Sequence, residues 1–338
     1  MTKILFTVEE YSGANNAGPK AKNDIKNILK DDGFKLVSSK INVHSKIAKL
    51  YAYFVTIPRL FNKNQIFDEI YFQYPTYSSF LMKKLINVLR RHTRKLIFII
   101  HDIESLRIFV NNKEYWKSEK ELLESADGLI VHNEEMKKWL KSRGIEIPMV
   151  NLEIFDYLSN FQPISNYKFS KSVCFAGNLS KSEFLNNLSF KNITLSVYGP
   201  NSKGNYKTGV EYNGQYSPNE LPQHLIQNFG LVWDGSSSET CNGKFGNYMK
   251  YNNPHKVSLY LSSGIPVVIW RHAALAKFIV NNHLGIAVDS LQEMDERVAA
   301  MSESEYNTYK TNAIKISGEL RSGEFIKKAV IKIEEQVQ

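Results

Sequence analysis

Short apolar runs alternate with amphipathic stretches along the first half of the chain. The runs are rich in Val, Ile, Leu and Phe, which is typical of strands buried on both faces. Strands alternating with helices are typical of βαβ units on a parallel sheet. The pattern predicts strands at residues 4–8, 35–38, 69–73, 96–101, 128–132 and 149–152, and helices at 20–30, 45–61, 78–92, 115–125 and 134–141.

A second series of the same kind follows an irregular segment at residues 156–170. We therefore predict an α/β protein with two doubly wound, Rossmann-like domains, residues 1–160 and 161–338, whose last helix is able to return to the first domain. A length of 338 residues suits two domains, and 43% hydrophobic with 12% aromatic residues excludes a disordered chain. The second series has strands at 173–176, 193–198, 230–233, 266–270 and 285–288, and helices at 217–227, 255–263, 273–281 and most of 291–337.

Ligands of open α/β sheets bind at the carboxyl ends of strands, so the loops after strands are the candidate sites. After the strand at 173–176, Gly177 allows close approach of a phosphate, and Asn178 and Lys181 supply donors. A plain turn with a solvated lysine is the alternative. Pro254 suits the start of the next candidate helix, whose free N–H groups and Lys256 form an anion site. The alternative is that His255 and Lys256 are merely first-turn residues, but cations there oppose the helix dipole, which favours a bound anion.

Several motifs carry a family resemblance. The sequence Pro254-His-Lys, followed by Tyr260-Leu-Ser-Ser-Gly-Ile-Pro-Val-Val, resembles the donor-site signature of GT-B glycosyltransferases. Further stretches resemble the bacterial β-1,6-galactofuranosyltransferases of O-antigen and capsule synthesis and, more distantly, the glucosyltransferases that glycosylate serine-rich repeat adhesins. These stretches are residues 101–107, 175–180, 229–235, 239–246 and 252–256.

The resemblance implies a GT-B fold, with two domains facing a cleft, and transfer of a sugar from UDP-galactofuranose to a glycan acceptor, expected to be lipid-linked. UDP-glucose or UDP-galactose with a glycoprotein or another glycan is the alternative, because no residue distinguishes a furanose from a pyranose pocket. Many retaining GT-B enzymes hold the ribose with a glutamate five residues before the helix-ending glycine. Leu259 occupies that position here, so we expect inversion.

The donor residues follow from these motifs. Stabilisation of the departing diphosphate is expected from Lys256, His255, Asn178 and Lys181. Two tyrosines and two acids are further donor-site candidates. The alternative is that the tyrosines only pack and that the acids are solvated loop residues. We assign the nucleotide base to Tyr198 and Tyr216, and the donor sugar hydroxyls to Asp234 and Glu239.

Inversion needs a base for the acceptor hydroxyl, expected in the first domain. Asp102 at the end of a buried strand is the first choice, Glu104 the next, and His101 the residue that orients them. The alternative is that Asp102 caps the following turn and that His101 is structural. Glu9 and Glu10 are rivals. The glycine-rich loop after them is expected to contact the acceptor through Asn15, Asn16, Gly18 and Lys20.

Neither a metal nor a cofactor is expected. No Asp-x-Asp motif occurs, and Asp102-x-Glu104 is weak evidence for a metal site. Cys174 and Cys241 have no C-x-x-C spacing. With no signal peptide and no long uncharged apolar run, we expect a cytoplasmic protein.

The basic excess lies at one end of the chain. The first hundred residues carry 17 Lys and Arg against 7 Asp and Glu, whereas the rest carry 26 and 27. An anionic membrane face is the expected partner, with the aromatic helix at 45–61 beside it, although such helical stripes are often core. Nucleic acid is a remote alternative, because no binding motif accompanies the charge. Two further alternatives stay open: that the protein is a degenerate GT-B subunit supporting a partner enzyme, and that it forms a homo-oligomer. The basic cluster is Lys83, Lys84, Arg90, Arg91, Arg94 and Lys95.

Overall fold

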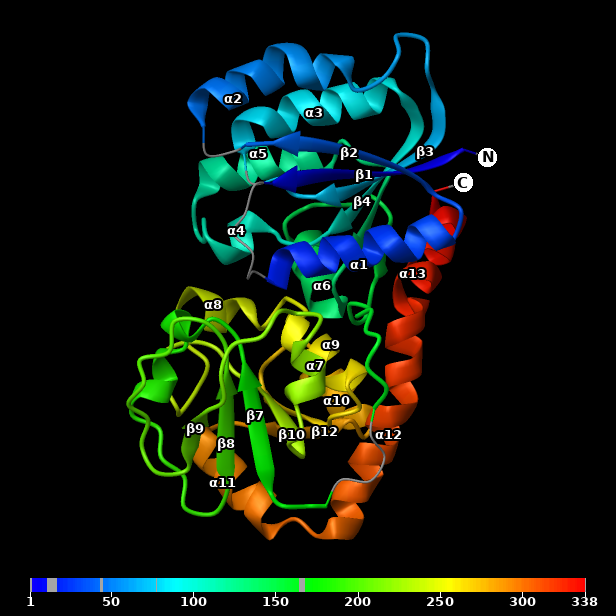
Figure 1. The fold of residues 1–338 in the computed structure, drawn as a ribbon. Helices are drawn as coiled ribbons and strands as arrows, with labels where there is room; N and C mark the ends of the chain where they lie inside the picture. Colours follow the sequence, from blue (N-terminus) through cyan, green and yellow to red (C-terminus); the bar gives the residue numbers. More distant parts are fainter. Residues whose placement is uncertain (1, 11–16, 43–44, 77, 164–167, 338) are drawn as a thin grey trace. The chain divides into compact units, whose positions relative to one another are not determined.

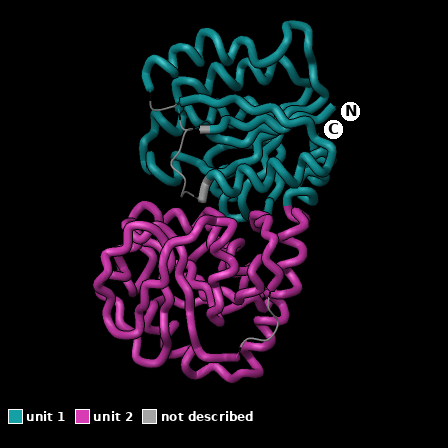
Figure 2. Tube along the Cα trace, viewed as in Figure 1, with its two compact units in different colours: residues 1–152, 326–338 teal, residues 153–325 magenta. Residues whose placement is uncertain are grey.

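A computed structural model describes residues 2–10, 17–42, 45–76, 78–163 and 168–337. The chain divides into two compact units, coloured separately in Figure 2. Unit 1 comprises residues 1–152 and 326–338, and unit 2 comprises residues 153–325. The sequence analysis placed this boundary at 160.

Unit 1 is built on a six-stranded parallel sheet with the order β2-β1-β3-β4-β5-β6. The inner strands are rich in buried apolar residues, and β4 ends in five consecutive buried positions, which keeps the middle of a parallel sheet dry on both faces. The edge strand β2 is mostly exposed or half-buried. The strands are β1 (Lys3–Glu10), β2 (Lys35–Ile41), β3 (Phe67–Tyr74), β4 (Thr93–Ile100), β5 (Gly128–Val131) and β6 (Met149–Asn151).

The helices of unit 1 lie on both faces of its sheet. In Figure 1, α2 and α3 lie on one face and α1 on the other. Asn112 and Asn133 cap α5 and α6 with their side-chain oxygens. The helical segments are α1 (Ala17–Asp31), α2 (Lys46–Tyr51), η1 (Ala52–Thr56), η2 (Ile57–Arg59), α3 (Ser79–Arg91), α4 (Glu104–Arg107), α5 (Lys113–Leu123) and α6 (Glu134–Ser142).

The end of α13 (Glu324–Gln336) belongs to unit 1. A Cβ on Gly128 would lie 2.9 Å from Cδ1 of Ile333, so the glycine at the start of β5 lets this helix pack closely. Lys3 Nζ lies 2.5 Å from Glu334 Oε1, and the hydroxyl of Tyr71 donates to the same oxygen at 2.9 Å.

Unit 2 repeats the architecture with a parallel sheet of order β12-β11-β10-β7-β8-β9. Its strands are β7 (Ser172–Ala176), β8 (Thr194–Tyr198), β9 (Val210–Tyr212), β10 (Phe229–Val232), β11 (Val267–Trp270) and β12 (Gly285–Val288). Its helical segments are η3 (Leu179–Lys181), η4 (Glu183–Asn186), α7 (Leu221–His224), α8 (Gly243–Tyr248), α9 (His255–Ser262), α10 (Ala276–Asn281), α11 (Leu291–Ala300), α12 (Glu303–Ser322) and the first residues of α13.

Helix α9 is fixed closely against the sheet by Tyr260. A Cβ on Gly230 of β10 would lie only 2.2 Å from the Tyr260 ring, so glycine makes room for that ring. The Tyr260 hydroxyl accepts a hydrogen bond from the backbone N–H of Ala176 at 2.8 Å. The first turn of α9 is thereby held at the carboxyl end of β7.

Every strand predicted from the sequence is present, with small shifts at the ends, and β9 is an additional strand. The long helix predicted at 291–337 divides into three. Ser302 caps the start of α12, and Gly323, with φ of 78°, ends it in a left-handed conformation. The helix predicted at 45–61 continues without interruption over residues 46–59, passing from α2 to the π-helix η1 and then to the 3₁₀ turn η2, where Pro58 occupies the first turn.

Candidate active site

Lys256 marks the centre of the candidate donor site in unit 2. Its ammonium lies 4.9 Å from the Phe175 ring centre and 4.0 Å from Asp234 Oδ2. A Cβ on Gly177 would lie 3.1 Å from Lys256 Cε, so glycine leaves the space that the lysine uses. The lysine side chain remains 23% exposed. A cation at the end of β7, beside the first turn of α9, is placed to bind an anion.

The loops after β7 and β8 meet at two glycines. Gly199 has φ of +138°, and a Cβ there would lie 1.8 Å from the carbonyl oxygen of Gly177. Only glycine tolerates both the backbone angle and this approach. Gly177 and Gly199 thus let the carboxyl ends of β7 and β8 approach closely next to Lys256.

Asn178 and Lys181 follow Gly177, as predicted from the sequence. Asn178 caps η3, because its Oδ1 accepts from the N–H of Ser180 at 3.1 Å and from Asn201 Nδ2 at 3.0 Å. Lys181 is exposed, and its ammonium lies 5.2 Å from the Phe245 ring centre. The amide therefore shapes the loop, while the lysine adds positive charge to it.

The two tyrosines assigned to the nucleotide base differ in exposure. Tyr198 is 3% exposed, and its hydroxyl donates to the carbonyl of His224 at 2.9 Å. Tyr216 is half-buried and stacks on the His224 ring, with centres 3.5 Å apart. Of the two, the ring of Tyr216 has the exposure that stacking on a base requires.

The acids assigned to the donor sugar also differ. Asp234 faces Lys256, and its Oδ1 accepts from the N–H of Gly235 at 2.9 Å. Glu239 is exposed and accepts from Ser238 Oγ at 3.2 Å. His255, assigned to the diphosphate, stacks on Phe155 with ring centres 5.0 Å apart.

In unit 1, the polar cluster predicted after β4 gathers around Arg107. This guanidinium lies 3.0 Å from Asp102 Oδ2 and also pairs with Glu104. His101 is buried, with its Nε2 2.8 Å from Gln73 Oε1. Because Gln73 donates its amide N–H groups to Thr7 Oγ1 and the carbonyl of Lys22, its oxygen accepts, and His101 Nε2 carries the proton.

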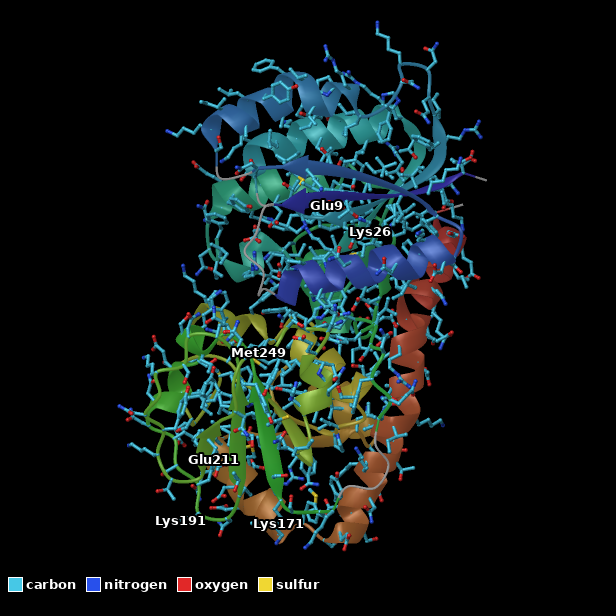
Figure 3. The ribbon with its side chains drawn as sticks, in the orientation of Figure 1. Glu9, Lys26, Lys171, Lys191, Glu211 and Met249 are labelled. Carbon is cyan, nitrogen blue, oxygen red and sulfur yellow. The ribbon has the colours of Figure 1, made fainter. Side chains whose placement is uncertain are left out.

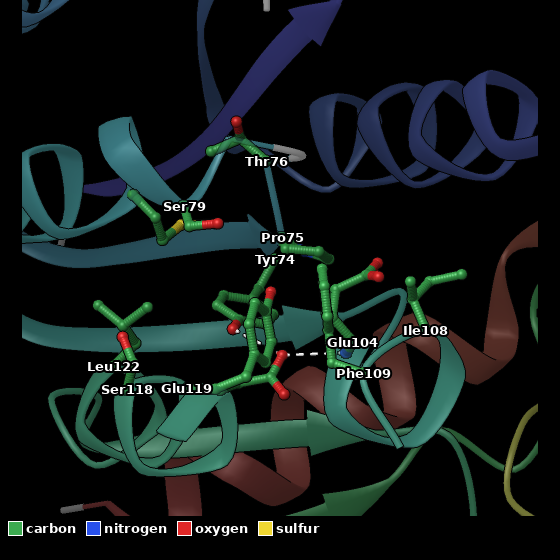
Figure 4. A pocket seen from close by; sticks show the side chains of 12 residues that line it. Tyr74, Pro75, Thr76, Ser79, Glu104, Ile108, Phe109, Ser118, Glu119 and Leu122 are labelled. Carbon is green, nitrogen blue, oxygen red and sulfur yellow. Dashed lines mark hydrogen bonds between the residues drawn. The ribbon is translucent and has the colours of Figure 1, made fainter. Parts of the chain in front are cut away.

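Glu119 of α5 holds the start of α4 in place. Its carboxylate accepts from the backbone N–H of Glu104 at 3.0 Å and from the Tyr74 hydroxyl at 3.1 Å (Figure 4). It also accepts from the backbone N–H of Ser105 at 2.8 Å. The α4 N-cap residue is Ile103, without a side-chain cap. The alternative that Asp102 caps this turn is therefore wrong. Burial raises the pKa of Glu104, although Arg107 opposes that shift.

The residues expected to contact the acceptor are only partly described. Asn15 and Asn16 lie outside the described residues, and Gly18 and Lys20 fall at the start of α1. The Lys20 ammonium lies 2.6 Å from Asp24 Oδ1. Glu9 pairs with Lys26 at 2.7 Å, a pair labelled in Figure 3, and this hydrogen bond lowers the pKa of Glu9. The Glu10 side chain also lies outside the described part.

The sequence analysis did not select Arg107, Gln73, Glu119 or Phe175. Of these, Arg107 had a sequence signal, since it follows Glu104 by three residues on a helix, where side chains are neighbours. Gln73 stands at the end of β3 and Glu119 within α5, so their contacts with the cluster depend on strand pairing and helix packing.

Within the described residues, no group of three or more His, Cys, Asp or Glu side chains is placed to hold a metal ion. Metal independence thus stays a prediction. In the same part of the chain, none of the helices has the length and apolarity to cross a membrane.

Known proteins similar to the chain agree with this architecture. The glucosyltransferase 3-like N-terminal domain model matches residues 3–154, and the C-terminal domain model matches residues 173–333. The β-1,6-galactofuranosyltransferase WbbI of Escherichia coli (strain K12) is 37% identical over 238 residues, 69% of each chain. Glucosyltransferase 3 of Streptococcus gordonii is 28% identical over 270 residues, 78% of each chain.

Among solved structures, sucrose-phosphate synthase from Thermosynechococcus elongatus matches with a TM-score of 0.65 at 12% identity, covering 100% of this chain and 99% of that one. The two parallel sheets and this likeness define a GT-B fold, which confirms the predicted fold class. The protein is a glycosyltransferase. The chain belongs to the glucosyltransferase 3-like family, which confirms the resemblance drawn from the sequence.

Proposed function

We propose that the protein transfers galactofuranose from UDP-galactofuranose to a glycan acceptor in cell-surface polysaccharide synthesis, with inversion and without a metal. The observation that carries the donor site is Lys256, which stands beside Gly177 at the first turn of α9. Its ammonium and the free N–H groups of the helix stabilise the negative charge of the departing diphosphate. The similarity to WbbI supports the choice of galactofuranose.

The base comes from the cluster around Arg107. Asp102 is the first choice from the sequence, and the structure adds a reason to favour Glu104, because Glu104 lines a pocket and burial raises its pKa. A carboxylate with a raised pKa accepts a proton more readily near neutral pH. In this mechanism Glu104 takes the proton of the acceptor hydroxyl as the new glycosidic bond forms and UDP departs.

The test is transfer by the purified protein from UDP-galactofuranose to methyl hexopyranosides, in the presence of EDTA. NMR of the product assigns the anomeric configuration. We expect UDP release, a β-linked galactofuranosyl product from an α-linked donor, and no effect of EDTA. Retention at the anomeric carbon or loss of activity in EDTA would contradict the proposed mechanism.

Glucosyl transfer is the second candidate, favoured by the similarity to Glucosyltransferase 3. UDP-glucose and UDP-galactose in the same assay rank the donors. A clear preference for UDP-glucose would favour this candidate over the first.

We also propose that unit 1 contacts an anionic membrane through an apolar patch, Ile47, Leu50, Tyr51, Phe54 and Phe80. Ile47 is 81% exposed and Phe54 is 69% exposed. A group of large apolar side chains exposed together marks an interaction site. Phe80 of α3 stacks on Tyr53 of η1 at 4.9 Å, which holds the two segments together. The alternative that the helical stripes are core holds for Ile57, Leu81, Leu85 and Val88, which are buried, but not for the residues of this patch.

The charge around the apolar patch fits an anionic lipid surface. Lys46 and Lys49 lie on α2, and Lys83 and Lys84 lie on α3 beside Phe80. Three members of the predicted basic cluster have carboxylate partners: Lys83 lies 3.8 Å from Glu121, and Arg90 and Arg94 pair with Asp127 and Asp68. Apolar insertion plus several lysines is the combination that gives reversible binding to anionic bilayers.

Sedimentation with phosphatidylglycerol vesicles tests this proposal, with phosphatidylcholine vesicles as the comparison. We expect Ile47→Ser with Phe54→Ser to lose most of the binding, and Ile331→Ser to retain it, since Ile331 is equally apolar and 57% exposed on α13. Analytical ultracentrifugation tests whether a second copy of the chain, rather than a membrane, covers the patch. An oligomer that dissociates on Ile47→Ser, with no binding to vesicles, would show that a second copy covers the patch.

A further inference from the structure

A pocket of about 240 Å³ lies in unit 1 at the carboxyl ends of β3 and β4 (Figure 4). Its walls come from the loop after β3 and from α3, α4 and α5. This volume is below the roughly 300–1,000 Å³ of drug-sized ligand sites, so it suits one small ring. The sequence analysis assigned no function to most of its residues.

One wall of the pocket is aromatic. The rings of Phe109 and Tyr115 stack with centres 3.9 Å apart and an angle of 21°. Phe109 is 39% exposed, so a ligand is able to reach it. Met82, Ile108 and Leu122 add apolar surface. Such a wall packs against the C–H face that a sugar ring presents.

The remaining lining groups are hydroxyls and carboxylates. Thr76 is 3% exposed, and its Oγ1 has no hydrogen-bond partner among the described residues. Ser79, Ser118 and Glu104 also line the pocket. An apolar face with a rim of donors and acceptors matches a sugar.

The charge of the lining excludes an anionic ligand. Glu104 and Glu119 face the pocket, and none of its described lining residues is Lys or Arg. Glu119 is fully engaged with Tyr74 and two backbone N–H groups. Glu104 pairs with Arg107 through Oε1, so its second carboxylate oxygen is the one that meets a ligand hydroxyl. A phosphate or nucleotide would therefore be repelled here, whereas the site around Lys256 attracts one.

We propose that this pocket binds the acceptor's terminal sugar, an uncharged hexopyranoside ring that stacks on Phe109 and places a hydroxyl at Glu104. This inference rests on the proposed function. It adds a binding site for the acceptor's sugar ring to the contacts that were predicted for the loop at residues 11–20. Glu104 would thereby act on the hydroxyl that the pocket presents.

Ligand-observed saturation-transfer NMR of methyl hexopyranosides with the full chain tests the pocket directly. We expect at least one sugar to bind, and Phe109→Ala to raise its Kd about tenfold, the loss of roughly 1.4 kcal/mol. Ser118→Trp provides a second variant, since it fills the rim from an exposed position on α5 without removing core packing. Ile66→Ala is the matched control, because Ile66 is also a large exposed apolar residue of unit 1, 65% exposed, but lies outside the pocket.

In the transfer assay, we expect Phe109→Ala and Ser118→Trp to raise the acceptor KM while the KM for UDP-sugar stays unchanged. Sugar binding that neither variant alters, or no binding by any sugar of the panel, would overturn the pocket proposal. Failure of the proposed function has a different signature, in which the unsubstituted protein neither binds UDP nor releases it from any UDP-sugar.

Discussion

Gly177→Ala moves Lys256 without removing its charge. The new Cβ would lie 3.1 Å from Lys256 Cε and 3.6 Å from its ammonium. No backbone strain accompanies the change, since Gly177 does not have a positive φ. The neighbour that must yield is the far end of a flexible side chain, so the protein folds and the lysine shifts.

The size of the effect follows from this geometry. Carbon atoms pack best at about 3.5–4.0 Å, so Cε retreats by roughly 0.4–0.9 Å. A hydrogen bond to a charged group contributes about 1.5–3 kcal/mol. Losing about half of that weakens UDP binding by roughly threefold to tenfold, since about 1.4 kcal/mol is a factor of ten.

Calorimetric titration with UDP and thermal unfolding measure the two consequences separately. Gly318→Ala is the matched control, since a Cβ there meets nothing within 4 Å on the exposed face of α12. That control gains about 1 kcal/mol of helix stability and keeps its UDP affinity. The reasoning is refuted if Gly177→Ala binds UDP as tightly as the unsubstituted protein, or if it fails to fold.

Two further predictions concern buried carboxyls. Burial and the charge of Glu334 raise the pKa of Glu69, so its folded form binds a proton more tightly than the unfolded form, and stability falls as pH rises through that range. Glu69→Gln should therefore raise the Tm at pH 8, and this increase in Tm should become smaller as the pH is lowered toward the ordinary pKa of Glu. An equal increase in Tm at every pH would contradict the raised pKa of Glu69. Glu104→Gln should lower kcat by about 10²–10⁴-fold with UDP affinity unchanged. The activity of the unsubstituted enzyme should increase as pH rises, with an apparent pKa above the ordinary value for Glu, because the base must be deprotonated. If Asp102→Asn has the larger effect and Glu104→Gln little, Asp102 is the base.

The sequence predicted the two sheets because parallel strands buried on both faces appear as continuous apolar runs. It did not predict the division of the last helix at Ser302 and Gly323, since a single serine or glycine within a helical pattern does not by itself end a helix. The three residues of β9 are too few to carry a pattern of their own.

The donor site was predictable where its residues follow strands directly. Gly177 follows β7 directly, whereas Lys256 was predicted from Pro254 at the start of its helix. The role of Gly199 was not predictable, because its need for glycine arises from the carbonyl of Gly177 on the neighbouring strand. The same holds for Glu119 and Phe109, whose contributions depend on how α5 packs.

Titration with UDP tests the central claim, that unit 2 holds a diphosphate donor through Lys256. The protein is titrated with UDP without added metal, again with EDTA, and beside Lys256→Ala. We predict micromolar binding that survives EDTA and weakens by tenfold or more in the variant, a loss of about 1.4 kcal/mol. Absence of UDP binding, or equal binding by Lys256→Ala, would contradict the donor site described for this protein.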